Sequence, residues 1–178
     1  MINVTLPDGS VREFDNGATA LDVAKSISEG LARNVLAAEV NGEVWDATRP
    51  LPEATKLRLL TWNDPEGKNT MWHSSAHLLA EAIEALYPGT KFGIGPPIEN
   101  GFYYDFSFHR PFTPDDLVAL EKRMAELAKK DEPVIRTVMP RDEAVKFFKD
   151  QGENYKAEII SSIPQGEDVS LYAEGKFT

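Results

Sequence analysis

The chain has 178 residues, of which 42% are hydrophobic and none is cysteine, and its formal net charge is −10. A length above the ~100–150 residues of a typical domain predicts one large or two small domains. The missing cysteines exclude disulfides and thiolate zinc sites, and the acidity of both halves argues against non-specific nucleic-acid binding. With no ~18-residue apolar run and no signal peptide, we expect a cytoplasmic location and no contact with a membrane.

The first part of the chain has short β-type runs separated by turn residues. Pro7-Asp8-Gly9-Ser10 joins the first two runs, and Asn41-Gly42 is a strong hairpin signal between the next two. The predicted strands are residues 3–6, 11–14, 35–40, 43–45 and 56–62.

One helix is predicted among these strands. Thr19 and Asp22 have the spacing of a capping box, and Gly30 offers a stop for the helix. One helix against a small mixed sheet within residues 1–62 predicts an α+β domain of the β-grasp, ubiquitin-like kind.

Turn-forming residues at 63–68 predict a linker, which makes residues 69–178 a second domain. Its first helix is expected to be capped by Asn69 or Thr70, to end at Pro88-Gly89 and to be largely buried. This helix carries His73 and His77, two of the three histidines in the chain. At ~3.6 residues per turn, both imidazoles project from one face.

The rest of the second domain predicts an α+β fold with a mixed or antiparallel sheet and covering helices. An aromatic-rich strand alternates over residues 102–109, and Thr113-Pro114 begins a helix with an apolar stripe of Leu117, Leu120, Met124 and Leu127. Further expected elements are a strand at 134–138, a helix at 142–149, an ambiguous segment at 155–160 and a strand at 169–172.

The spacing of His73 and His77 allows three interpretations. Two such histidines often satisfy each other structurally inside a helix pair. As a metal site they supply two ligands where a catalytic zinc needs about three, so His109 or a carboxylate would have to join them. As an acid–base pair, neutral imidazoles with a pKa near ~6.5 hold or activate a water molecule.

Two segments and their order carry a resemblance to a known family. Residues 72–79, Trp-His-Ser-Ser-Ala-His-Leu-Leu, and residues 94–105, Ile-Gly-Pro-Pro-Ile-Glu-Asn-Gly-Phe-Tyr-Tyr-Asp, resemble the second domain of bacterial threonyl-tRNA synthetases. Residues 1–62 resemble the TGS module of the same family. Residues 120–124 and 152–156 continue the resemblance, which covers essentially the whole chain.

The resemblance implies a domain that hydrolyses seryl-tRNA made in error. By position, His73, His77 and Lys156 are similar to the family's catalytic residues, and Tyr104, Gly95 and Pro96 to residues that line its substrate pocket. Without the family context, Lys156 is more typical of a solvated surface amine, and Tyr104 of the hydrophobic core.

The family's pattern also contains parts that this sequence lacks. Its editing motif continues with a Cys-x-x-x-His segment, which would follow Thr178, so we expect an N-terminal fragment without half of the pocket. ATP, Mg and one zinc are implied for the family's aminoacylation core, and no cofactor for this chain. The implied partners are the 3′ end and acceptor arm of tRNA, the remainder of the synthetase and a homodimer formed through the core.

Two alternatives from other classes stay open. One is a non-catalytic docking module for RNA or protein, because β-grasp domains often serve as docking surfaces. The other is a free-standing zinc hydrolase that uses His73, His77 and a carboxylate.

Overall fold

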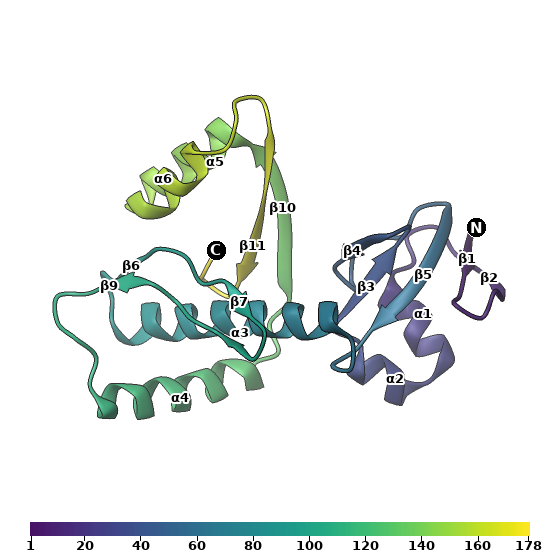
Figure 1. Ribbon diagram of the computed structural model, residues 1–178, viewed down its shortest axis with the longest axis horizontal. Helices are drawn as coiled ribbons and strands as arrows, with labels where there is room; N and C mark the ends of the chain where they lie inside the picture. Colours follow the sequence, from purple (N-terminus) through teal and green to yellow (C-terminus); the bar gives the residue numbers. More distant parts are fainter. The chain divides into compact units, whose positions relative to one another are not determined.

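The computed structural model describes residues 1–178 and divides them into two compact units, Met1–Trp72 and His73–Thr178 (Figure 1). The division falls inside the helix α3 (Pro65–Leu86), which contributes its first turns to one unit and the remainder to the other. No helix has both the length and the apolar character that crossing a bilayer requires.

The first unit contains a five-stranded mixed sheet in the order β2-β1-β5-β3-β4. Strands β1 and β5 run parallel, and the other neighbours are antiparallel. Asn41 and Gly42 form the β3–β4 turn with φ angles of 51° and 90°, which confirms the predicted hairpin. The topology is that of a β-grasp. Its strands are β1 (Ile2–Thr5), β2 (Val11–Phe14), β3 (Ala37–Val40), β4 (Glu43–Trp45) and β5 (Ala54–Leu60).

One helix packs on this sheet as predicted, and a short second helix, which buries no side chain, follows it. The capping box of Thr19 and Asp22 starts α1 (Ala20–Ile27), as expected. Gly30 does not stop it, however, because Ser28 both ends α1 and caps a second helix, α2 (Glu29–Asn34). Buried side chains of α1 and the strands, including Val4, Val23 and Val40, form the core of this unit.

The predicted linker is wrong, because most of its residues are helical. Helix α3 begins at Pro65 rather than near Thr70. The Asp64 carboxylate accepts the backbone N–H of Thr61 at 2.8 Å, and Pro at the first helical position loses no hydrogen bond there. The helix is also less buried than expected, since Ala76, Ala80 and Ile83 are buried but His73 is exposed.

The second unit has antiparallel strand pairs and helices around two apolar cores. Alternating burial over 102–109 is confirmed, but the continuous strand is wrong. Two-residue strands replace it: β6 (Lys91–Phe92) pairs with β9 (Phe106–Ser107), and β7 (Pro97–Ile98) with β8 (Gly101–Phe102). This segment folds back on itself through two short pairs, so no single long strand forms.

Helix α4 (Pro114–Lys129) has the predicted start, with Thr113 and Asp116 in a second capping box. Leu120 and Leu127 are buried, whereas Leu117 is 56% exposed and lies outside the expected apolar stripe.

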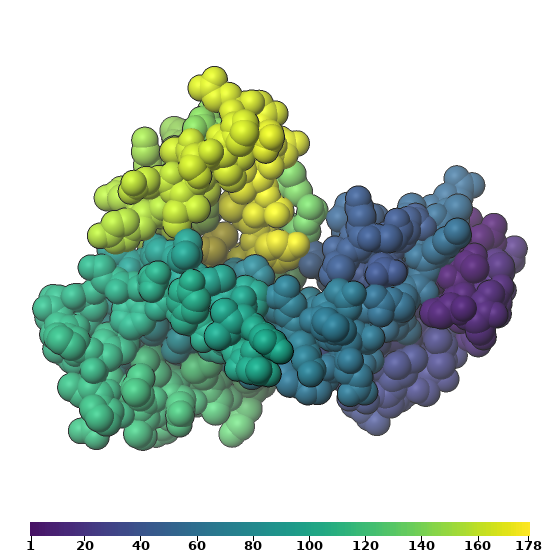
Figure 2. Space-filling model, in the orientation of Figure 1, coloured from purple at the N-terminus to yellow at the C-terminus, as the bar shows by residue number.

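The last part of the chain joins a strand pair to a helix pair. Strand β10 (Val134–Pro140) pairs antiparallel with β11 (Asp168–Glu174), and the helices between them are α5 (Arg141–Asp150) and α6 (Asn154–Ser161). The ambiguous segment at 155–160 is thus helical. Helix α6 contacts β6, and in Figure 2 the yellow-green surface of α5 and α6 borders the teal surface that follows α3.

Candidate functional site

The two histidines of α3 lie edge to face. The ring centroids of His73 and His77 are 5.0 Å apart with an interplanar angle of 78°. His73 is exposed and His77 is half-buried, one helical turn deeper in the unit. The predicted common face is therefore confirmed, with one ring open to solvent and one ring in contact with the interior.

Burial keeps both imidazoles uncharged near neutral pH. It lowers the pKa of His77 to about 4, helped by the positive charge of Lys156 and by that which His73 would carry when protonated. Partial burial also lowers the pKa of His73. A neutral imidazole has one unprotonated ring nitrogen, so each ring is able to accept a hydrogen bond from water.

Lys156 reaches the same region from α6. Its Nζ lies 4.1 Å from the ring centroid of Phe177 and 5.5 Å from that of Phe92, and it donates a hydrogen bond to the backbone carbonyl of Thr178 at 2.8 Å. The ring of Phe177 contacts His77 edge-on, with centroids 5.4 Å apart. Phe177 thus connects the ammonium group to the imidazole pair.

Two opposing effects act on the pKa of Lys156. Burial lowers it, while the negative charges of Glu153 and Glu84 raise it. The half-buried ammonium group is therefore easier to deprotonate than a surface lysine.

Tyr104 and Gly95 form another wall of this region. The Tyr104 ring contacts Phe92 with centroids 5.6 Å apart, and Phe92 in turn contacts Phe177 at 5.4 Å. A Cβ atom on Gly95 would collide with the Tyr104 ring, so only glycine fits at this position. Burial and the charge of Glu153 raise the pKa of Tyr104 to about 12, which keeps its hydroxyl protonated as a donor. Pro96 follows in the same loop and is half-buried.

The structure brings His73, His77, Lys156, Tyr104 and Gly95 together through aromatic contacts. Sequence reasoning missed the residues that connect and charge this cluster, namely Phe92, Phe177, Glu84 and Glu153. Glu153 lies in the 152–156 segment of the family resemblance, so that motif could have indicated it. Phe177 is far from every other member in sequence, and no local pattern marks it.

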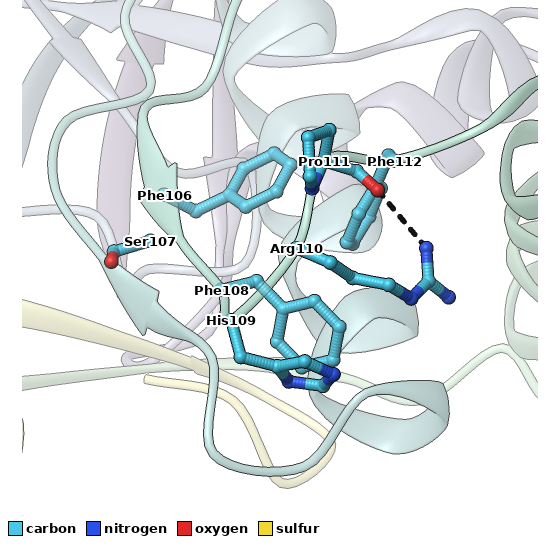
Figure 3. Close-up of a pocket in the computed structure, with 7 residues that line it drawn as sticks. All are labelled: Phe106, Ser107, Phe108, His109, Arg110, Pro111 and Phe112. Carbon is cyan, nitrogen blue, oxygen red and sulfur yellow. Dashed lines mark hydrogen bonds between the residues drawn. The ribbon is translucent and has the colours of Figure 1, made fainter.

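The third histidine lies elsewhere in the second unit. The His109 ring contacts that of Phe108 at an interplanar angle of 50°, with centroids 4.1 Å apart, in a loop that lines an open cavity of about 440 Å³ (Figure 3). The loop is anchored by Arg110, which pairs with Asp116 at 2.6 Å. No three His, Asp or Glu side chains in the chain are arranged to hold a metal ion. The expected third ligand of a zinc site is thus not supplied by His109.

Comparisons with known proteins agree over the whole chain. Residues 2–61 match the TGS domain. The chain is 63% identical to a threonine–tRNA ligase of Polynucleobacter asymbioticus over 175 residues, which are 98% of this chain and 27% of that protein. It is 55% identical to that of Cytophaga hutchinsonii, over all of this chain and 28% of that protein.

A threonine–tRNA ligase of Polynucleobacter necessarius shows the same relationship, with 63% identity over 178 residues, which are 28% of its length. The chain spans little more than a quarter of the relatives that it matches. The β-grasp sheet of the first unit agrees with the TGS match. Over its full length, the chain belongs to the threonine–tRNA ligase family.

Proposed function

We propose that this chain is the part of a threonine–tRNA ligase that hydrolyses seryl-tRNA made in error. The observation that carries the proposal is the convergence of an uncharged imidazole, a half-buried ammonium group and a protonated phenol, from His77, Lys156 and Tyr104. These are the groups that ester hydrolysis needs, a hydrogen-bond acceptor for water and donors for the developing negative charge. Membership of the ligase family supports an aminoacyl ester of tRNA as the substrate.

A physical need for such a site follows from the size of the two amino acids. A pocket that accepts threonine also admits serine, because one missing methyl group changes binding by only ~1–3 kcal/mol. A second site that admits serine and excludes the larger threonine removes the wrong product. We place this second site at the aromatic cluster of the second unit.

In the proposed reaction, water attacks the carbonyl carbon of the seryl ester and the bond to the ribose oxygen breaks. His73 and Lys156 position the water, and the Lys156 ammonium faces the oxygen that becomes negative. The free hydroxyl of the terminal ribose assists proton transfer to the leaving oxygen. The products are serine, tRNA with both terminal hydroxyls free, and one proton released to the solvent as the new carboxyl group ionises, so atoms and charges balance.

The proposed partners are the 3′ end and acceptor arm of tRNA and the remainder of the ligase. We infer that the longer family members join threonine to tRNA in a different part of the protein, with ATP and Mg, and dimerise there. In this arrangement the present chain would correct errors made by that other part. A cytoplasmic location fits this role.

The proposal is tested by His73→Ala in the full-length ligase that carries this sequence. We expect serine release from seryl-tRNA to fall about 100-fold, because an oriented water is lost, while threonine attachment stays near the unaltered rate. His109→Ala is the matched control and should leave both rates unchanged. Normal removal of serine by the His73→Ala ligase would exclude His73 from the site.

The docking alternative makes a different prediction in the same assay. If the chain serves only to hold tRNA, variants of the cluster should change tRNA binding and leave the rate of serine release from bound seryl-tRNA unaffected. The zinc alternative predicts a stoichiometric metal in the purified chain that is lost with His77→Ala.

A further inference from the structure

One carboxylate oxygen at the edge of the candidate site has no partner. Oε2 of Glu153 is buried and makes no hydrogen bond. The backbone of Glu153 is fixed, because its N–H donates to the Phe148 carbonyl at 2.9 Å and its carbonyl accepts from Ala157 at 3.1 Å. Although Glu153 precedes α6, its side chain does not cap the helix. Leaving a buried acceptor unpaired is costly, so this oxygen needs an explanation.

The surroundings of Glu153 favour a positively charged ligand. Glu153 lies three residues before Lys156 in the chain, and its negative charge raises the pKa of both Lys156 and Tyr104. Glu84 is the second carboxylate that acts on Lys156, and Lys176 also acts on Glu84. Lys176 is exposed, whereas Lys156 is half-buried. Glu84 is exposed and therefore solvated, and Lys156 donates its hydrogen bond to the Thr178 carbonyl, so the buried Oε2 of Glu153 is left without a donor.

We propose that Glu153 binds the protonated amino group of the aminoacyl ester. This inference rests on the proposed hydrolysis of seryl-tRNA. An aminoacyl ester carries one cationic group, attached one carbon from the carbonyl that water attacks. In this proposal Lys156 faces the carbonyl oxygen, and Glu153, three residues earlier in the chain, takes up the amino group. The site thereby selects esters of amino acids over esters of hydroxy acids.

The direct test is binding to the 178-residue chain of adenosine that carries serine through a 3′-amide, which resists hydrolysis. A matched probe carries glyceric acid, in which a hydroxyl replaces the amino group. The unaltered chain should bind the seryl probe roughly 10–100-fold more tightly, the range expected for one charge-assisted hydrogen bond. In Glu153→Gln this preference should disappear through weaker binding of the seryl probe alone.

Glu158→Gln, on the exposed side of α6, is the control and should keep the preference. Thermal unfolding of Glu153→Gln separates recognition from a structural role, because removing an unpaired buried charge should leave the Tm unchanged or raise it. Equal binding of both probes by the unaltered chain, or an unchanged preference in Glu153→Gln, would overturn the inference.

A rate measurement distinguishes this inference from the proposed function. In the full-length ligase, Glu153→Gln should slow the hydrolysis of seryl-tRNA and leave that of glyceryl-tRNA unchanged. If the unaltered ligase hydrolyses neither ester, the proposed function fails. If it hydrolyses both and Glu153→Gln slows them equally, hydrolysis stands and the role of Glu153 in amine binding is refuted.

Discussion

Single aromatic contacts hold the functional groups of the site in place. Phe177 is 1% exposed, and its ring touches His77, Phe92 and the ammonium group of Lys156. The negative face of the ring favours the charged form of the lysine. One side chain thus contacts both the imidazole of His77 and the ammonium group of Lys156.

Phe177→Leu should separate the contacts of the aromatic ring with His77 and Lys156 from its apolar packing. The smaller side chain keeps the core apolar, at a cost of about 1–2 kcal/mol in the free energy of unfolding. Loss of the ring should lower the pKa of Lys156 further, measured by NMR titration, and slow serine release about 10-fold. Phe177→Tyr keeps the ring and should restore both. An unchanged Lys156 pKa in Phe177→Leu would show that the ring does not position the ammonium group.

Gly95 provides a second test at this scale. In Gly95→Ala, the new methyl group must displace the Tyr104 ring, so we expect a loss of about 1–3 kcal/mol in stability and weaker binding of the seryl probe. Gly30→Ala is the matched control, because a Cβ there meets only the Ser28 hydroxyl at 4.0 Å and helix α2 favours alanine. Equal stability of the two variants in urea unfolding would contradict the close approach of the Gly95 backbone to the Tyr104 ring.

At the scale of elements, the turn after β11 delivers Phe177 to the site. Glu174 and Phe177 exchange backbone hydrogen bonds of 2.8 and 3.0 Å, which close the turn. Three carboxylates lie around it: that of Glu81, which is 8% exposed, that of the exposed Glu132 and that of the half-buried Glu174. Burial first, and then the charges of Glu81 and Glu132, raise the pKa of Glu174 to about 7.

This turn should make stability depend on pH. Because the folded pKa of Glu174 exceeds its ordinary value of 4.5, the folded protein binds the proton more tightly. Glu174 therefore adds to the free energy of unfolding fully below about pH 4.5, and this stabilisation is lost as the pH rises through about 7. His77 acts in the opposite direction, since its pKa of about 4 lies below 6.5 and its contribution is lost as pH falls.

Glu174→Gln isolates the carboxylate. The variant should be more stable than the unaltered chain at pH 8, where Glu174 is charged, and the difference should shrink toward pH 5. Urea unfolding at the two pH values measures it, and Glu167→Gln, on the exposed loop before β11, is the control. A stability difference between Glu174→Gln and the unaltered chain that grows as the pH falls would contradict the raised pKa of Glu174.

Elements whose signals are local were predictable from the sequence. The capping box at Thr19 and the Thr113-Pro114 helix start were predicted and begin α1 and α4, because each signal involves only residues close in sequence. The start of α3 was misjudged because Pro and Gly at 65 and 67 are typical of both a turn and a first helical turn. The prediction of one strand over 102–109 was wrong for another reason. Alternating burial indicates which side chains face the core, but it does not indicate which backbone segments pair with each other.

For the whole molecule, the sequence indicated the candidate residues but not the contacts that join them. His73, His77 and Lys156 came from motifs, while their meeting depends on Phe92 and Phe177, which are far apart in the chain. Contacts of that range leave no periodic signal in a single sequence. The unpaired oxygen of Glu153 likewise depends on burial and hydrogen bonding in the folded chain, which the sequence alone does not show.

The most direct measurement is the initial rate of serine release from seryl-tRNA by the full-length ligase, compared with threonine release from threonyl-tRNA. We expect the seryl ester to react roughly 10–100-fold faster, as one methyl group allows, and Lys156→Met to abolish the difference while Lys146→Met does not. Equal rates for the two esters in the unaltered ligase, or full activity in Lys156→Met, would contradict the assignment of this cluster to the removal of serine.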